Sequence, residues 1–331
     1  MVRLSSDGGR VVALSGGIGG AKLALGLSRV LAPGRLTVVA NTGDDFEHLG
    51  LSISPDLDTL LYTLGGNADE DKGWGRRDET WNFMRALETL GGPTWFQLGD
   101  GDLATHVERT HRLAAGETLT AIMDDFRRRL GVPCPLLPMS DDAVRTRVRT
   151  AAGWIDFQDY FVRQRCAPVV MGIEFRGVET ARAQPLVLDA LADPSLRAVV
   201  ICPSNPLISI EPILAVSGIR QALVACRAPV IAVSPLVGGK AIKGPTAKML
   251  GELGGVPDTA GIAHRYHDIL DGLIIDTIDA ADADNVDLPV AVAPTVMVTL
   301  QDRENLARAV LDFADFLPAA KTAGPGAWRR R

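Results

Sequence analysis

The stretch RVVALSGGIGGAKLALGLSRVLAPGRLTVVA, residues 10–40, decides the fold. Residues 10–15 and 36–40 are short apolar runs typical of buried strands, and residues 21–31 repeat apolar side chains at helical spacing. A strand, a helix and a strand in succession predict a βαβ unit with parallel strands and a right-handed crossover.

The alternation of strand and helix returns near residue 196. We expect further strands at 197–202, 230–234, 272–276 and 289–298. We expect further helices at 55–64, from 210–216, at 245–253 and at 303–317. Between the two halves lie helical patterns at 78–90, 102–114 and 117–130, a proline-bounded break at 133–138 and strict alternation at 144–150.

This pattern predicts one large α/β domain over residues 1–317, with a Rossmann-like, doubly wound, mostly parallel sheet. Its core would comprise 10–65 and 196–317, and approximately 66–195 would form a helical or mixed insert. We expect residues 318–331 to be a flexible tail, because they are rich in Gly, Pro and Ala.

The composition excludes several classes of protein. Of 331 residues, 47% are hydrophobic, which suffices for a packed core and excludes a disordered or fibrous chain. The formal net charge of −6 gives no general attraction to nucleic acid or to a membrane surface, and no apolar run is long enough to span a bilayer. The four cysteines lack metal-site spacing, so we expect reduced thiols in a cytoplasmic protein.

A glycine-rich loop follows the first predicted strand and opens the first predicted helix. Its glycines would let backbone amides converge on an anion at a helix N-terminus, so it favours phosphate binding. It is neither a Walker A loop nor a complete dinucleotide fingerprint, and a tight turn without a ligand is the alternative. The candidate phosphate-binding residues are Gly16, Gly17, Gly19, Gly20 and Lys22.

Four aspartates lie close together in the sequence after the second predicted strand. Asp44 and Asp45 could hold a hard cation such as Mg²⁺, bind a ribose hydroxyl or simply form a turn. Asp56 and Asp58 fall in the first turn of a helix, where the helix dipole already favours acidic residues. Taken together, the four predict a divalent-cation site.

Other polar segments are also candidate contacts. Asp102 could cap a helix, and His106, one turn later, could be structural or contact a substrate. The loop 202–206 carries Ser204 and Asn205 after a strand, and the loop 234–245 supplies Lys240 and Lys243 to a phosphorylated ligand. Each loop could also be a solvated turn. Arg145, Arg147 and Arg149 could meet phosphate or carboxylate, or form a solvated face.

A nucleophilic triad is not supported, because the sequence has no GxSxG elbow and no Cys/His pairing. The polar residues instead favour metal-assisted phosphoryl transfer.

The motifs resemble the 2-phospho-L-lactate transferases of coenzyme F420 biosynthesis (CofD/FbiA type). The matching segments run in order over nearly the whole chain, and SPDLDT, GDGDLATH and SPLVGGKAIKGP are the specific ones. They are GGIGGAK (16–22), NTGDD (41–45), SPDLDTLLYTLGG (54–66), GWGRRDETW (73–81), GDGDLATH (99–106), LLPMSDD (136–142), CPSNPLISI (202–210) and SPLVGGKAIKGP (234–245).

The resemblance implies a Mg²⁺-dependent enzyme, commonly a homodimer. Its donor would be a three-carbon acid linked to guanylyl diphosphate, and its acceptor Fo, a deazaflavin with a ribityl chain. The terminal ribityl hydroxyl would attack phosphorus, and GMP would leave. Which acid the donor carries (lactate, enolpyruvate or glycerate) stays open.

The resemblance also suggests roles for individual residues. The glycine loop with Lys22 would cradle phosphate, and Ser204, Asn205, Lys240 and Lys243 would hold the guanylyl donor. Thr59, Trp81, Asp102 and His106 would line the deazaflavin pocket. The metal ligands would be Asp44, Asp45, Asp56 and Asp58, with Asp45 and Asp58 also orienting or deprotonating the hydroxyl.

Two other functions are alternatives to the transferase. A nucleotide-sugar-binding regulator of the gluconeogenesis-factor type has a similar glycine loop, but we do not expect SPDLDT or SPLVGGKAIKGP there. A nicotinamide dehydrogenase is disfavoured by the incomplete fingerprint.

Overall fold

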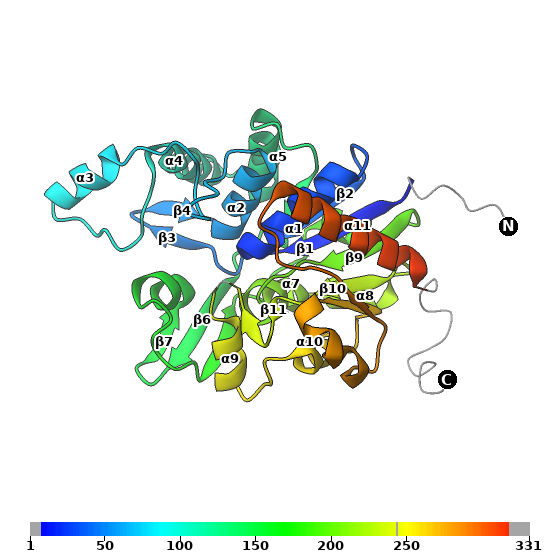
Figure 1. The fold of residues 1–331 in the computed structure, drawn as a ribbon. Coiled ribbons are helices and arrows are strands. Elements are labelled where there is room, and N and C mark those ends of the chain that lie inside the picture. Colours follow the sequence, from blue (N-terminus) through cyan, green and yellow to red (C-terminus); the bar gives the residue numbers. More distant parts are fainter. Residues whose placement is uncertain (1–7, 243, 318–331) are drawn as a thin grey trace.

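A seven-stranded sheet forms the centre of the part of the chain that the computed structural model describes, residues 8–242 and 244–317 (Figure 1). Its strand order is β14-β13-β10-β9-β1-β2-β5, and all its neighbouring strands are parallel. The strands are β1 (Arg10–Ser15), β2 (Leu36–Ala40), β5 (Leu136–Pro138), β9 (Leu196–Ile201), β10 (Val230–Val233), β13 (Gly272–Ile275) and β14 (Val290–Val292).

Both faces of the sheet are buried. Val12 and Leu14 of β1 belong to one apolar core, and Val11 and Ala13 belong to the other, because successive side chains point to opposite faces. The second core is covered by α1 (Gly17–Val30), α2 (Pro55–Leu64), α5 (Leu119–Arg129) and α11 (Leu300–Phe316). The first is covered by α6 (Pro185–Ala192), η2 (Pro206–Ile210), α7 (Glu211–Ala215), α8 (Ile219–Ala225), α9 (Thr246–Glu252) and α10 (Thr259–Arg265).

The predicted α/β, Rossmann-like, doubly wound fold is therefore confirmed. In chain order, the strands of the sheet lead outward from β1 in one direction through β2 and β5, and then in the other direction from β9. The order reverses between β1 and β9. In such sheets, ligands bind at the carboxyl ends of the strands beside this switch point.

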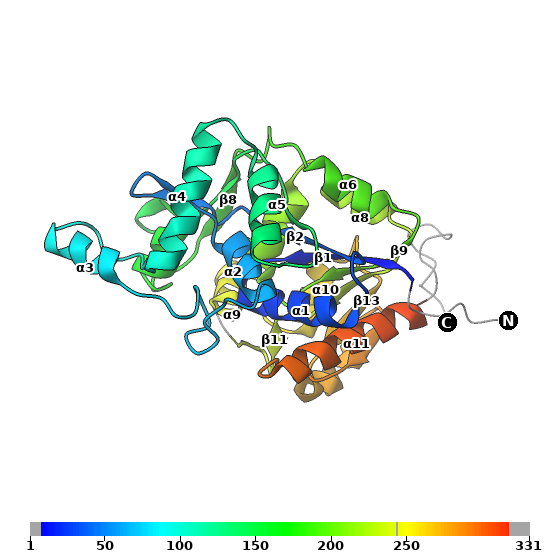
Figure 2. The same cartoon turned by 90° about the horizontal axis from the view of Figure 1, so that it is seen from above.

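Two small units stand at that end of the sheet (Figures 1 and 2). One has its own apolar cluster, which includes Ile53, Met84 and Leu98. It combines the hairpin β3 (Phe46–His48) and β4 (Leu51–Ile53) with α3 (Asn82–Thr89) and α4 (Asp100–Ala114). The other is an antiparallel sheet of β6 (Arg145–Thr150), β7 (Gly153–Asp156) and β8 (Gly172–Arg176), with η1 (Asp159–Arg163) beside it.

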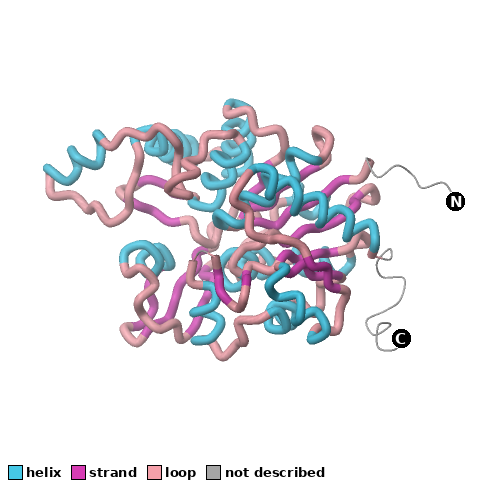
Figure 3. Tube along the Cα trace, in the orientation of Figure 1, coloured by secondary structure: helices cyan, strands magenta, loops and turns pink. Residues whose placement is uncertain are grey.

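Loops and short elements connect the strands of the central sheet to the helices around it (Figure 3). A short hairpin of β11 (Leu236–Val237) and β12 (Lys240–Ala241) follows β10, and the 3-10 helix η3 (Thr277–Asn285) follows β13. None of the described helices is long and apolar enough to cross a membrane.

The sequence expectations differ from the structure at several places, and the helix expected at 78–90 spans Asn82–Thr89. The break at 133–138 contains β5, which pairs with β2, so part of the expected insert belongs to the main sheet. β5 is an edge strand, where proline is tolerated. The strand expected at 289–298 stops at Val292, shortly before Pro294, and the first helix begins at Gly17 rather than at residue 21. The expected tail at 318–331 lies outside the described residues.

Candidate functional site

A cavity of about 680 Å³ lies at the switch point of the sheet. Segments from both halves of the chain line it, among them the start of α1, the first turn of α2 and the loop after β9. Twelve residues that the sequence analysis singled out are in its lining: Gly16, Gly17, Gly19, Lys22, Asp44, Asp56, Asp58, Thr59, Asp102, His106, Ser204 and Asn205.

The glycine loop is packed tightly against the carboxylate of Asp56. The backbone N–H of Gly17 donates to Asp56 Oδ1 at 2.6 Å, and Gly17 has a positive φ of 65°. A Cβ on Gly16 would lie 2.6 Å from Asp56 Oδ2, so only glycine fits there. The other carboxylate oxygen accepts from Asn41 Nδ2 at 2.9 Å. Asp56 thus organises the loop that opens α1.

The N-terminus of α1 faces the cavity, as a phosphate-binding loop requires. Lys22, however, donates from Nζ to the backbone carbonyl of Met297 at 2.7 Å. It therefore also ties α1 to the loop after β14. Gly20 is not in the lining. It lies behind the loop, where a Cβ would come within 2.5 Å of Ser204 Oγ.

The carboxylates of Asp44 and Asp45 are buried, and hydrogen bonds compensate little for their loss of solvent. One oxygen of each, Asp44 Oδ1 and Asp45 Oδ1, has no hydrogen-bond partner among the described residues. Burial, together with the neighbouring charge of Asp56, raises the pKa of Asp44 well above its ordinary value. Burial raises the pKa of Asp45 to about 7, although Arg145 and a hydrogen bond from Ser54 act in the opposite direction.

This donor set fits a divalent cation. Buried carboxylates with open oxygen atoms and raised pKa values are what a hard cation such as Mg²⁺ stabilises in its ionised form. Burial also raises the pKa of Asp56 to about 6, but both of its oxygens already accept hydrogen bonds. Asp44 and Asp45 are therefore the aspartates of the predicted constellation that have ligand positions open.

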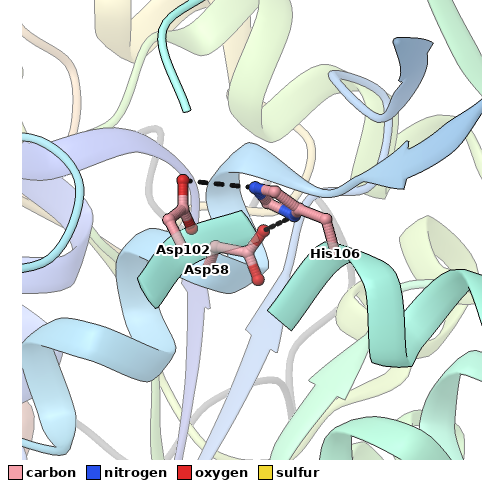
Figure 4. Close-up of side chains that lie close together, drawn as sticks. All are labelled: Asp58, Asp102 and His106. Atoms are coloured by element: carbon pink, nitrogen blue, oxygen red, sulfur yellow. Dashed lines mark ion pairs between the residues drawn. The ribbon is translucent and has the colours of Figure 1, made fainter. Parts of the chain in front are cut away.

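The carboxylate of Asp58, unlike those of Asp44 and Asp45, is bound by an arginine. Arg109 of α4 is fully buried and engages both carboxylate oxygens of Asp58, with Nη1 at 3.0 Å from Oδ2. His106 lies between two carboxylates, with Nδ1 at 3.6 Å from Asp58 and Nε2 at 3.2 Å from Asp102 (Figure 4). Ligand atoms of these three residues lie within 4.8 Å of one another, a spacing that a metal could use. Because Arg109 already binds Asp58, we interpret this cluster of side chains as an ion-pair network.

The network continues through Tyr62 of α2. Its hydroxyl donates to Asp102 Oδ1 at 2.6 Å. Burial opposes ionisation of Asp102, but the hydrogen bonds from His106 and Tyr62 hold its pKa below its ordinary value. Asp102 therefore carries a negative charge beside the cavity. Neither Arg109 nor Tyr62 was predicted as a site residue, because neither belongs to a polar loop.

Aromatic side chains form another part of the wall. Trp74 lines the cavity, and the predicted Trp81 does not, because Trp81 lies at the start of α3 and packs on Trp74 with ring centroids 6.3 Å apart. The other aromatic lining residues are Tyr62, Trp95, Phe96, Phe157 and Phe161. The pair Trp95-Phe96, just before GDGDLATH, was the sequence signal that could have revealed this wall.

The two loops predicted to hold the guanylyl donor, 202–206 and 234–245, contribute unequally to the lining of the cavity. Asn205 accepts from the N–H of Leu207 at 2.9 Å, and its buried Nδ2 has no partner among the described residues. In the loop 234–245, Ile242 and Gly244 line the cavity, whereas Lys240 is exposed outside the lining. Lys243 lies outside the described residues.

The raised pKa of Asp45 predicts how stability depends on pH. Asp45 has a folded pKa of about 7 against an ordinary value of 3.8, so the folded state binds more protons between these values. Its contribution to stability is present below pH 4 and is lost as the pH rises through about 7. We expect Asp45→Asn to melt at a higher temperature than the wild type at pH 8 without Mg²⁺, and the difference to shrink toward pH 5.

Millimolar Mg²⁺ should raise the melting temperature of the wild type at pH 8 and that of Asp45→Asn much less. The exposed Asp287→Asn is the matched control and should behave as the wild type does. An Asp45→Asn variant that melts below the wild type at pH 8, or gains equally from Mg²⁺, would contradict the cation assignment.

Comparison with known proteins agrees with the motifs. Residues 11–313 match the family described as 2-phospho-L-lactate transferase CofD. A phosphoenolpyruvate transferase of Kitasatospora aureofaciens is 40% identical over 92% of this chain and 98% of its own length. A 2-phospho-L-lactate transferase of Methanococcoides burtonii is 36% identical over 92% of this chain and 99% of its own.

A solved structure of a UPF0052 family protein from Bacillus halodurans has the same fold. Its TM-score is 0.62 at 14% identity, and the match covers 92% of this chain and 99% of that one. At this identity the likeness concerns the fold alone.

Proposed function

We propose that this chain, which belongs to the 2-phospho-L-lactate transferase CofD family, acts in coenzyme F420 biosynthesis. It would transfer a phosphorylated three-carbon acid from a guanylyl diphosphate-linked donor to Fo (7,8-didemethyl-8-hydroxy-5-deazariboflavin), with release of GMP. The observation that carries the proposal is that one cavity has a helix N-terminus and buried carboxylates at one part of its wall and aromatic rings at another.

The phosphate-binding features suit the donor. The N-terminus of α1 favours a diphosphate, and Asn205, which lines the same cavity, has an unpartnered Nδ2 that could donate to a ligand. Several relatives, including the Kitasatospora protein, are named phosphoenolpyruvate transferases. We therefore propose a phosphoenolpyruvyl donor in preference to phospholactyl or phosphoglyceryl.

The aromatic residues suit the acceptor. A deazaflavin ring is planar and aromatic, and Trp74, Trp95 and Phe96 offer faces and edges to stack against it. Asp102, Thr59 and His106 lie in the same lining and can bind the ribityl hydroxyls. Trp81 supports Trp74 from behind.

Asp44 and Asp45 would hold Mg²⁺, which supplies charge neutralisation of the transferring phosphoryl group when bound. The ribityl oxygen would bond to phosphorus as the bond to GMP breaks. Asp45, which would be ionised when the cation is bound, would accept the hydroxyl proton. Asp56 shapes the glycine loop, and Asp58 anchors Arg109 behind the reacting groups.

The test is GMP release on incubation with Fo, Mg²⁺ and each guanylyl-linked donor, measured by chromatography. We expect release that requires all three components. Absence of GMP with every three-carbon donor, together with binding of a nucleotide sugar, would favour the regulator of the gluconeogenesis-factor type. Sedimentation would test the homodimer that we also propose.

Asn205→Asp is expected to raise the donor KM at least tenfold and leave the Fo KM within about twofold. The aspartate keeps the oxygen that accepts from Leu207, so the local turn survives, but it removes the amide donor and repels a diphosphate. The matched control Asn305→Asp, on the exposed face of α11, should change neither constant. An unchanged donor KM in Asn205→Asp would exclude this residue from donor binding.

A further inference from the structure

A second cavity, of about 350 Å³, lies beside the first. It is bounded by the segment Gly43–Glu47 and by the small sheet β7-β6-β8, and two of the three arginines singled out in β6, Arg145 and Arg147, line it. The two cavities share three lining residues, Asp44, Phe157 and Gln158. A molecule held at Asp44 in the larger cavity is therefore next to the smaller one.

The arginines of the smaller cavity differ in their availability. Arg147 is paired with Glu174 at 3.0 Å and with Asp156 at 3.5 Å. Arg145 donates to the carbonyl of its neighbour Val144, and its charge acts on Asp45. The guanidinium of Arg176, at the end of β8, has no hydrogen bond or ion pair within the described part of the chain. Arg145 and Arg176 are thus cations with capacity for a ligand.

Buried polar atoms around the same space lack partners. Thr146 Oγ1 and Asp45 Oδ1 have none among residues 8–242 and 244–317, and both side chains are at least nine-tenths buried. Phe46 and Phe157 supply apolar surface between these groups. The cavity therefore combines two cations, a hydroxyl and an apolar wall in a volume that can hold a small acid.

We propose that the smaller cavity receives the carboxylate of the three-carbon acid, bound by Arg145 and Arg176, while the phosphate of the same donor stays beside Asp44. This inference rests on the proposed function. Arginine forms two parallel hydrogen bonds to a carboxylate, which gives both affinity and orientation. Four carboxylates in the lining oppose an anion. Asp156 is already paired with Arg147, Glu47 is exposed at the rim, and the cation proposed above would neutralise Asp44 and Asp45.

The test compares two guanylyl-linked donors that differ only in the carboxylate: the phosphoenolpyruvyl donor and its analogue without that group. Donor affinity is measured calorimetrically without Fo, and kcat/KM is measured with Fo. The variants are Arg145→Ala, Arg145→Lys and Arg176→Ala. Arg149→Ala is the matched control, since Arg149 is on the same strand, bonds to the carbonyl of Met171 and does not line the cavity.

We expect the wild type and Arg149→Ala to prefer the carboxylate-bearing donor at least tenfold. Arg145→Ala and Arg176→Ala should lose most of that preference by weakening only the carboxylate-bearing donor, and Arg145→Lys should recover part of it. An unchanged preference in both alanine variants would overturn the inference, as would equal weakening of the two donors. Failure of the proposed function is distinct, because the wild type would then form no Fo product with either donor.

Discussion

Asp45→Asn is expected to lower kcat about a thousandfold and to leave the fold intact. The substitution removes one of the two buried carboxylates with an open oxygen, and with it the group proposed to accept the hydroxyl proton. Loss of a positioned proton acceptor alone costs about 10² to 10⁴ in rate. The measurement is GMP release at saturating donor and Fo, across a series of Mg²⁺ concentrations.

The control for this variant is Asp287→Asn, an exposed aspartate on the loop after η3. It should retain wild-type turnover. Asn at position 45 is nearly isosteric with the protonated acid, so circular dichroism should match the wild type. A kcat within tenfold of the wild type at every Mg²⁺ concentration would show that Asp45 neither holds the cation nor takes the proton.

Asp58→Ala is expected to lower the free energy of unfolding by about 3–5 kcal/mol. It would leave the fully buried guanidinium of Arg109 without its partner, and an uncompensated buried charge carries a penalty of this size. The measurement is the midpoint of urea denaturation, with activity followed separately. Loss of activity in this variant would then reflect lost structure as well as lost chemistry.

Two further variants separate the ion pair from the site. Arg308→Ala breaks an exposed pair with Glu304 on α11 and should cost less than about 1 kcal/mol. Replacing both partners, in Asp58→Ala with Arg109→Met, should recover part of the loss because the unpaired buried guanidinium is removed as well. If Asp58→Ala cost no more than Arg308→Ala, the buried network would not stabilise the fold.

The fold could be predicted from the sequence where the hydrophobic periodicity is strong. Residues 10–15 and 36–40 match β1 and β2, and 55–64 matches α2, since these segments are apolar on the face or faces that they bury. The edge strand β5 was missed because it is three residues long and ends in proline. The strand at 289–298 was too long, since nothing local distinguishes β14 from the loop that follows Pro294.

The candidate site could be predicted from the sequence only in outline. The topology brings the glycine loop, the aspartates and the loop with Ser204 to one cavity, as strand ends at a switch point should. Spacing could not reveal that Arg109 holds Asp58 or that Lys22 bonds to Met297, because both contacts join segments far apart in the chain. Likewise, Trp81 was the predicted ring partner, but Trp74, which the sequence analysis did not name, lines the cavity in its place.

The most direct test of the transferase is the mass of the product formed from Fo, Mg²⁺ and the phosphoenolpyruvyl guanylyl donor. We expect one new deazaflavin whose mass exceeds that of Fo by one phosphoenolpyruvyl group, formed in equal amount to GMP. Fragmentation should place the group on the terminal ribityl oxygen. Unmodified Fo beside released GMP, or a guanylylated deazaflavin, would contradict the account.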